Sequence, residues 1–197
     1  MRDTHVAYAA LVVAALAGAW LLFVSLPRWY APEPTALAAL PALDDEVAVD
    51  VAQLDTSPPI TATLFYVSED GMRLVGVERE IPAGKTTTEQ ARRIAEWQLS
   101  SAPSPLASAV PDGTTLRAIF VTPQGDAFVD LSREVSMGHP GGSLEELFTV
   151  YAIVNALTMN VPDITAVQIL VEGREVDTLA GHVDLRHPLG SNLEWVQ

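Results

Sequence analysis

The sequence predicts an α+β domain in which two helices pack on a mainly antiparallel sheet, preceded by one transmembrane helix. Three observations lead to this prediction. Short segments of alternating apolar and polar residues occur in pairs around turn residues, as in β-hairpins. Two longer segments with apolar residues at helical intervals follow the first two pairs. An uncharged apolar run stands near the N-terminus. The resulting order of elements, ββα-ββα-ββ, is typical of an α+β fold.

The N-terminal run is predicted to be a membrane anchor. Residues 6–26 carry no charge, and as a helix they span about 32 Å, close to the roughly 30 Å hydrocarbon core of a bilayer. The alternative is a cleaved signal peptide with the small residues 17–19 as its cleavage site. Cleavage there leaves an apolar stretch on the mature terminus, so we interpret residues 1–27 as an uncleaved signal anchor.

The distribution of basic residues predicts the orientation of this anchor. No Lys or Arg occurs between Arg28 and Arg73, and the positive-inside rule favours translocation of a flank that lacks positive charge. We therefore expect a single-pass protein of the cell membrane. Its N-terminus is cytoplasmic and its C-terminal domain is extracytoplasmic, either periplasmic or on the cell surface.

Residues 28–59 are predicted to be a linker. Together with Pro27, this segment holds six of the chain's 14 prolines, and it carries six acidic side chains against the single Arg28. Proline removes hydrogen-bond donors and like charges repel, so such a segment does not pack a core. A flexible coil of this length spans about 30 Å, which holds the folded domain away from the membrane.

The first ββα unit comprises strands at 60–67 and 73–81 and a helix from about 86 to 100. Both strands alternate apolar with polar residues, and the segment between them has turn chemistry, which predicts a hairpin. Thr86 and Glu89 have the spacing of a capping box, in which a side-chain oxygen and a carboxylate bind the free amides of a helix start.

The second unit has strands at 116–121 and 127–131 and a helix that ends at about Met159, and a third hairpin pairs 166–171 with 175–179. Ser143 and Glu146 again have the spacing of a capping box and follow a Gly-rich loop. The apolar residues of this helix recur at three- and four-residue intervals and form one predicted stripe: Leu144, Leu147, Phe148, Tyr151, Val154 and Leu157.

The stretch from Gly141 to Leu189 resembles the C-terminal half of a GerMN domain. The similar elements are a Gly-Ser helix start, the helix end Ile153–Thr158, a turn glycine, and the segment Thr178–Leu185 followed by a proline. Residues 64–82 and 109–117 also fit the family. The positions matching its motifs are Gly141, Ser143, Asn155, Gly173, Gly181, His182 and Asp184. We therefore expect a GerMN-like domain at residues 60–190 and a tail at 191–197.

The resemblance implies a non-enzymatic role in the assembly of the bacterial cell envelope. GerMN domains occur in exported or lipid-anchored envelope proteins, including sporulation and spore germination proteins. This chain departs from the lipoprotein members because it contains no cysteine that could carry a lipid.

Composition excludes several other classes of function. The net charge is −14, from 11 basic and 25 acidic side chains. Such a surface repels phosphate groups, so neither nucleic-acid binding nor docking on anionic lipids through a basic patch is expected. The absence of cysteine excludes disulfides, thiolate metal sites and a cysteine nucleophile.

His182, Asp184 and His187 are the candidate metal ligands, since imidazole and carboxylate groups bind transition metals. In an extended segment, however, residues 182 and 184 point to one face and residue 187 to the other. The alternative is that His182 forms a local hydrogen bond and Asp184 caps a turn in a segment that covers the sheet edge. We favour this structural interpretation and expect no metal or other cofactor.

The remaining polar residues are also interpreted as structural. Ser143 lacks the glycine two residues later that a nucleophile elbow requires. Asp126 fits a turn, and Asp130 fits a solvent-facing strand position or one at the rim of the sheet. Asn155 interrupts an apolar helix end, and we expect its amide to bind backbone groups of the adjoining strand.

These observations together predict a membrane-anchored extracytoplasmic module that is not an enzyme. It binds another envelope protein or copies of itself, and the strand edge at 175–179 is a candidate for pairing with a partner strand. The alternative is a cell-wall glycan-binding module or a metal-dependent envelope hydrolase that uses His182, Asp184 and His187.

Overall fold

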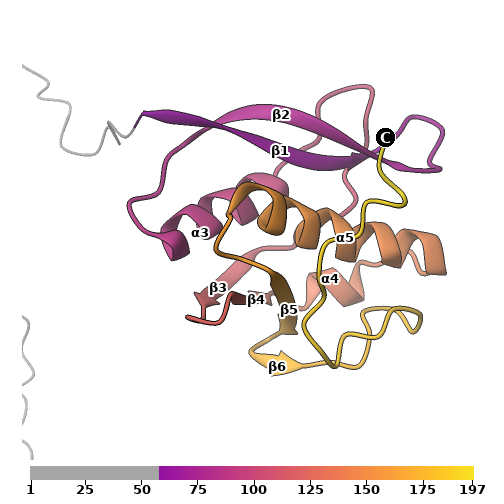
Figure 1. Ribbon diagram of the computed structural model, residues 1–197. Helices are drawn as coiled ribbons and strands as arrows, with labels where there is room; N and C mark the ends of the chain where they lie inside the picture. The colour runs from indigo at the N-terminus through magenta and orange to yellow at the C-terminus, as the bar shows by residue number, and fades with distance from the viewer. Residues whose placement is uncertain (1–57) are drawn as a thin grey trace, which may run out of the picture. The chain divides into compact units, whose positions relative to one another are not determined.

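The computed structural model describes residues 58–197, so the predicted anchor and nearly all of the predicted linker lie outside the described residues. Within 58–197, none of the helices combines the length and the apolar character that a bilayer crossing requires. The elements are β1 (Pro59–Val67), β2 (Leu74–Pro82), α3 (Thr87–Gln98), β3 (Leu116–Val121), β4 (Asp126–Leu131), α4 (Glu134–Met137), α5 (Ser143–Asn160), β5 (Ala166–Val171) and β6 (Arg174–Glu175) (Figure 1).

The described residues form three layers (Figure 1). The antiparallel hairpin β1–β2 lies on one side, α3 and α5 lie in the middle, and a four-stranded sheet of order β3-β4-β5-β6 lies on the other side. The α+β prediction is confirmed, and so are its first two hairpins and the Thr86 cap of α3, whose hydroxyl accepts the Glu89 amide. The helices lie between two sheets, whereas the sequence predicted packing on one.

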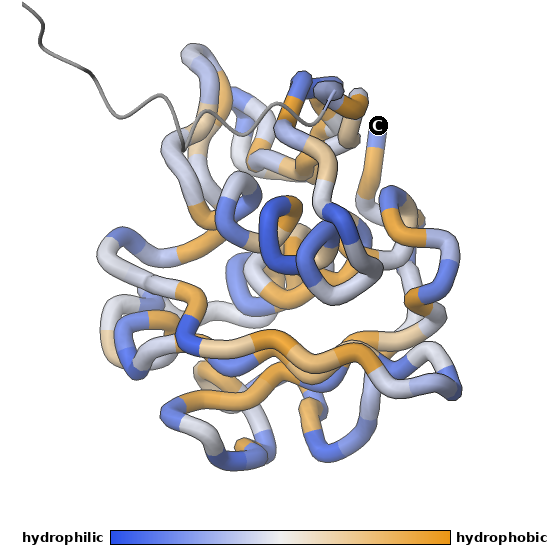
Figure 2. Tube along the Cα trace, turned by 90° about the vertical axis from the view of Figure 1, so that its left-hand side faces the viewer, coloured by the Kyte–Doolittle hydropathy of each residue, from blue (hydrophilic) through white to orange (hydrophobic). Residues whose placement is uncertain are grey.

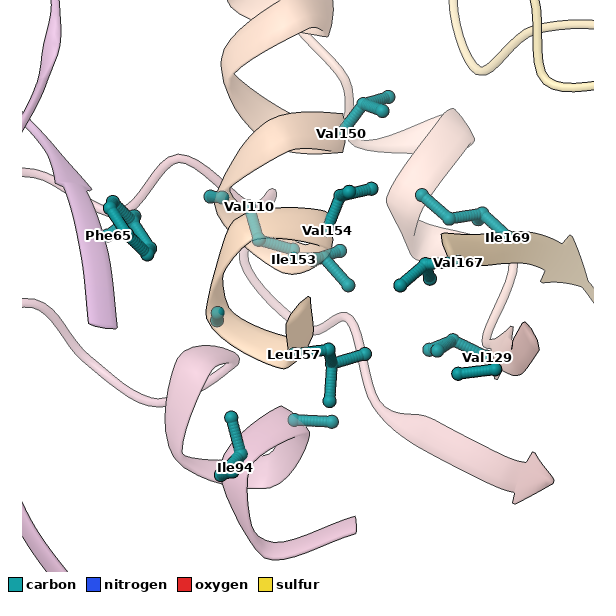
Figure 3. Packing of buried hydrophobic residues seen from close by; sticks show 14 of the residues in the cluster. Phe65, Ile94, Val110, Val129, Val150, Ile153, Val154, Leu157, Val167 and Ile169 are labelled. Carbon is teal, nitrogen blue, oxygen red and sulfur yellow. The ribbon is translucent and has the colours of Figure 1, made fainter. Parts of the chain in front are cut away.

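Helix α5 is enclosed on nearly all sides. The predicted stripe was too narrow, because its neighbours Val150, Ala152, Ile153 and Ala156 are also buried. Figure 3 shows Phe65 of β1 on one side of α5 and Val129, Val167 and Ile169 of the four-stranded sheet on the other. A helix that contacts two apolar layers is apolar all round.

The four-stranded sheet contains one parallel pair, which the hairpin pattern did not predict. β4 and β5 run in the same direction, with Asp126 opposite Ala166 and Leu131 opposite Val171. A parallel pair needs a long connection, and α5 supplies it by crossing the inner face of the sheet. In Figure 2 the apolar positions gather along the strands and helices that meet in the middle of the domain, and hydrophilic positions gather at the turns.

The predicted third hairpin is much shorter than expected. β6 has only two residues, Arg174 and Glu175, so the predicted strand at 175–179 does not form. The chain leaves the sheet because later backbone groups bind elsewhere: the amides of Leu179 and Ala180 donate to a side chain of α5. Further along the same edge of β5, Val167 pairs with Leu189 instead.

Two amide side chains occupy the edge of β1 that faces away from β2. Phe65 N–H donates to Gln98 Oε1 at 2.9 Å, and Gln98 Nε2 donates to the Phe65 carbonyl at 2.7 Å. Asn160 binds Thr63 in the same way, at 2.8 and 2.7 Å. Each amide presents one acceptor and one donor, so the two side chains bind the strand as a neighbouring strand would.

Backbone segments complete the edges of this hairpin. Val67 and Ala107 exchange two backbone hydrogen bonds of 2.8 and 3.0 Å at the end of β1. On the outer edge of β2, Leu74 donates to Trp195 and accepts from Gln197, at 2.8 and 2.9 Å. The C-terminal residues therefore form part of the fold and pair in parallel with the start of β2.

We expect Gln98→Met to destabilise the protein by about 2–5 kcal/mol, because the side chain keeps its size but leaves a buried N–H and a buried C=O of Phe65 without partners. Urea unfolding of the full-length protein measures this. Gln124→Met makes the same chemical change at an exposed turn position and should cost less than about 0.5 kcal/mol. Equal costs would refute the role assigned to Gln98.

Candidate functional site

The buried carboxylate of Glu146 organises the loop that contains the predicted metal ligands. This side chain is fully buried in α5. Its Oε1 accepts hydrogen bonds from the amides of Leu179 and Ala180, at 2.8 and 2.9 Å. Its Oε2 accepts the His182 amide at 2.7 Å and lies 3.1 Å from His182 Nδ1. One carboxylate thus binds three residues of the loop, Leu179, Ala180 and His182.

The predicted capping box of Ser143 and Glu146 is wrong. The N-cap of α5 is Gly142, Ser143 is the first helical residue, and no side chain caps the helix start. Glu146 points into the interior, where the loop amides replace the helix amides as its donors. The carboxylate of Glu145 lies against Gly142 instead, so a Cβ at position 142 would collide with it.

The pKa of Glu146 is lowered by the groups around it. Burial by itself raises the pKa of a carboxyl group, but the amides of Ala180, His182 and Leu179 and the ring of His182 all favour the ionised form. Their combined effect exceeds that of burial. The carboxylate is therefore ionised at neutral pH, and its charge is held by dipoles of the loop backbone.

The three predicted metal ligands do not converge. His182 faces Glu146, while Asp184 forms a two-pronged ion pair with Arg186, at 2.9 and 2.6 Å, that holds the pKa of the Asp184 carboxyl far below its usual range. His187 is exposed. Between residues 58 and 197, no three His, Cys, Asp or Glu side chains form a group that could hold a metal ion.

The glycines of the predicted motif lie in turns. Gly141, Gly173 and Gly181 all have positive φ angles. At Gly173 this conformation is required by the β5–β6 turn, and its amide donates to Asp130 Oδ1 at 2.6 Å. Asp130 is only 8% exposed, so of the two predicted positions the solvent-facing one is wrong: its carboxylate fixes this turn.

Asn155 binds the C-terminal segment and not a strand. Its side chain is fully buried, as an amide within an apolar helix end should be. Its Nδ2 donates to the Asn192 carbonyl at 2.7 Å, and its Oδ1 accepts the Asn192 amide at 2.9 Å. The predicted partner, an adjoining strand, is therefore corrected: Asn155 fixes residues 191–197 on α5.

A surface hollow of about 490 Å³ lies beside the N-terminal end of α5. We call it the α5 hollow. Its apolar wall comprises Val110, Pro111, Pro140, Leu144 and Phe148, and its carboxylates are those of Asp112 and Glu145. The turn between β1 and β2 lies at the same end of the domain (Figure 1) and contributes Gly71.

Thr149 connects the walls of the α5 hollow. Its hydroxyl donates to the Ala109 carbonyl at 2.5 Å and lies 3.2 Å from His139 Nε2, while His139 Nδ1 accepts the Gly141 amide. The Gly-rich loop is therefore bound to α5. Sequence reasoning missed this hollow, because its residues come from segments that are distant along the chain. The polar Thr149 within an apolar helix was the one available signal.

We expect Glu146→Gln to destabilise the protein by about 2–4 kcal/mol at pH 7, because a carboxamide replaces one acceptor by a donor that faces N–H groups. Since the folded pKa is lowered, this stabilisation is full above the unfolded pKa of about 4.3 and is lost as pH falls through the folded pKa. Urea unfolding between pH 7 and pH 3 measures it. Glu145→Gln is the control, and a pH-independent cost for Glu146→Gln would contradict the assignment.

Asn155→Ala should cost roughly 2–4 kcal/mol, since it leaves the backbone of Asn192 without partners. Hydrogen exchange should rise at residues 191–197. In contrast, Asn192→Ala keeps the bound backbone groups and should cost less than about 1 kcal/mol. Unchanged thermal stability of Asn155→Ala would rule out a structural role.

Comparisons with known proteins identify the same family as the sequence motifs. The model of the Germane family, described as sporulation and spore germination, matches residues 63–177. No curated protein sequence matches the chain.

Solved structures of GerMN domains have a fold similar to that of this chain. The tandem GerMN domains of the sporulation protein GerM from Bacillus subtilis align with a TM-score of 0.53 and 19% identity, over 68% of this chain and 46% of theirs. The first of these domains alone gives 0.50 and 18%, over 68% and 96%. A candidate lipoprotein from Clostridium perfringens gives 0.48 and 20%, over 76% and 93%. Because the family model covers more than half of its length, this chain belongs to the Germane family and carries one GerMN-like domain.

Proposed function

We propose that this chain is a membrane-anchored extracytoplasmic module that binds another protein of the bacterial cell envelope and catalyses no reaction. This proposal rests on the hydrogen-bond partners of the buried polar side chains. Glu146, Asn155, Gln98 and Asp130 all bind backbone groups of the domain itself. These side chains stabilise the fold, whereas the α5 hollow is open at the surface to an external ligand.

The proposed location rests on the sequence. Residues 6–26 have the length and apolarity of a bilayer-spanning helix, and the Pro-rich acidic residues 28–59 have the composition of a spacer. Together with the absence of Lys and Arg between Arg28 and Arg73, this arrangement supports a GerMN-like domain outside the cytoplasm, tethered to the cell membrane. A role in envelope assembly agrees with the sporulation and spore germination description of the family.

The alternative of a glycan-binding or hydrolytic module has less support. Stacking on sugars needs exposed aromatic faces, but the ring of Trp97 is covered by the guanidinium of Arg79, 5.6 Å from its centroid. The exposed rings of Trp195 and Phe120, 40% and 64% exposed, come from different layers of the domain, because Trp195 pairs with β2 and Phe120 belongs to β3. Of the three candidate metal ligands, His182 is bound to Glu146 and Asp184 to Arg186, while His187 is exposed.

In-cell crosslinking of the tagged full-length protein, followed by mass spectrometry, tests the proposal. We expect one or a few envelope proteins to be recovered, and recovery to be lost when residues 60–197 are replaced by an unrelated folded domain on the same anchor. Recovery of this chain alone would favour self-assembly. Equal recovery with the replacement domain would contradict the proposal, as would a stoichiometric metal in the purified protein that is lost in His182→Ala.

A further inference from the structure

The α5 hollow has the polar chemistry of a site for a cation. Its backbone groups are largely used within the protein: the Pro111 carbonyl accepts from Thr114, the Ala109 carbonyl from Thr149, and the Val110 carbonyl from Ser108. By contrast, the carboxylates of Asp112 and Glu145 make no hydrogen bond or ion pair with any residue between 58 and 197. Both residues are exposed, and no Lys or Arg lines the hollow.

The rest of the hollow is apolar and suits a side chain with a long aliphatic stem. Leu144 and Phe148 supply one wall and Val110 and Pro111 another. An Arg or Lys side chain buries its methylene groups on such a surface while its charged end reaches a carboxylate. A volume of about 490 Å³ exceeds that of one side chain, so neighbouring apolar residues of the same peptide also fit.

Two exposed methionines are next in sequence to residues that lie at or near the hollow. Met72, 61% exposed, is adjacent to the lining residue Gly71. Met137, 76% exposed, precedes Gly138, whose Cα faces the side chain of Pro111. Flexible methionine side chains are frequent at surfaces that accommodate a peptide.

From these observations we infer that the α5 hollow binds a peptide segment of a partner protein that presents an Arg or Lys side chain between apolar residues. The basic group binds the carboxylates of Asp112 and Glu145, and the flanking apolar residues contact Leu144 and Phe148. The inference rests on the proposed function, which it deepens by naming the chemistry of the partner. The net charge of −14 favours the approach of such a segment.

Fluorescence anisotropy with two labelled peptides tests the inference on the full-length protein in nanodiscs. The probes are Gly-Leu-Arg-Leu-Gly and Gly-Leu-Glu-Leu-Gly. We expect the arginine peptide to bind at least about tenfold more tightly, since it gains two ion pairs and the glutamate peptide meets like charge. Equal binding of the two peptides overturns the inference, and so does the absence of arginine-peptide binding at about 1 mM.

Charge reversal locates the binding site. The double variant Asp112→Lys plus Glu145→Lys should weaken binding of the arginine peptide at least about tenfold. The matched control, Glu78→Lys plus Glu175→Lys, changes the net charge by the same amount at exposed positions outside the hollow and should leave binding within about twofold. Urea unfolding checks that both variants fold. Equal weakening in both variants overturns the inference.

A photocrosslink separates this inference from the proposed function. Because the chain has no cysteine, a benzophenone maleimide reacts only with an introduced one, at Met72→Cys or, as a control near the other end of α5, at Met159→Cys. Capture from position 72 of a partner peptide that contains Arg or Lys supports the inference, provided that the lysine double variant abolishes it. Capture from position 159 alone keeps the proposed function and overturns the inference. Capture from neither position overturns the inference, and the in-cell crosslinking described above then decides the proposed function.

Discussion

The enclosure of α5 between two sheets is the constraint on which the rest of the structure depends. A helix in this position has no solvent-facing side along most of its length, so each polar side chain on it must find a partner inside the protein. Glu146, Thr149 and Asn155 all meet this condition by binding backbone groups of other segments. The polar residues of α5 therefore decide where the loops and the C-terminal residues lie.

Hydrogen bonds from side chains and backbone segments also close several edges of the two sheets. A free strand edge pairs readily with other chains, and β1 is closed by the amides of Gln98 and Asn160 and by the backbone of Ala107. The outer edge of β5 is closed by β6 and Leu189. Because the expected strand at 175–179 is replaced by a loop bound to Glu146, that segment is not available for pairing with a partner strand.

Where edges are closed in this way, binding capacity lies in side chains at the surface and not in open backbone. The α5 hollow illustrates this: its backbone carbonyls are used by Thr149 and Thr114, while Asp112 and Glu145 remain without partners among the described residues. A site of this kind is selective for charge and for an aliphatic stem, and it can serve an assembly module without any catalytic group. The family membership and the hollow thus support the same kind of role from independent observations.

The sequence by itself determined the α+β class, the first two hairpins, both long helices and the family, because alternation, helical spacing and turn residues are local properties. It also indicated that Asn155 is structural. Only the tertiary structure decided the partners of the polar residues. The local spacing of Ser143 and Glu146 predicted a cap, but the amides of Leu179, Ala180 and His182 bind the same carboxylate in the interior. The division of strands between two sheets, the parallel β4–β5 pair and the α5 hollow arise from contacts between segments distant in the chain, which no local pattern records.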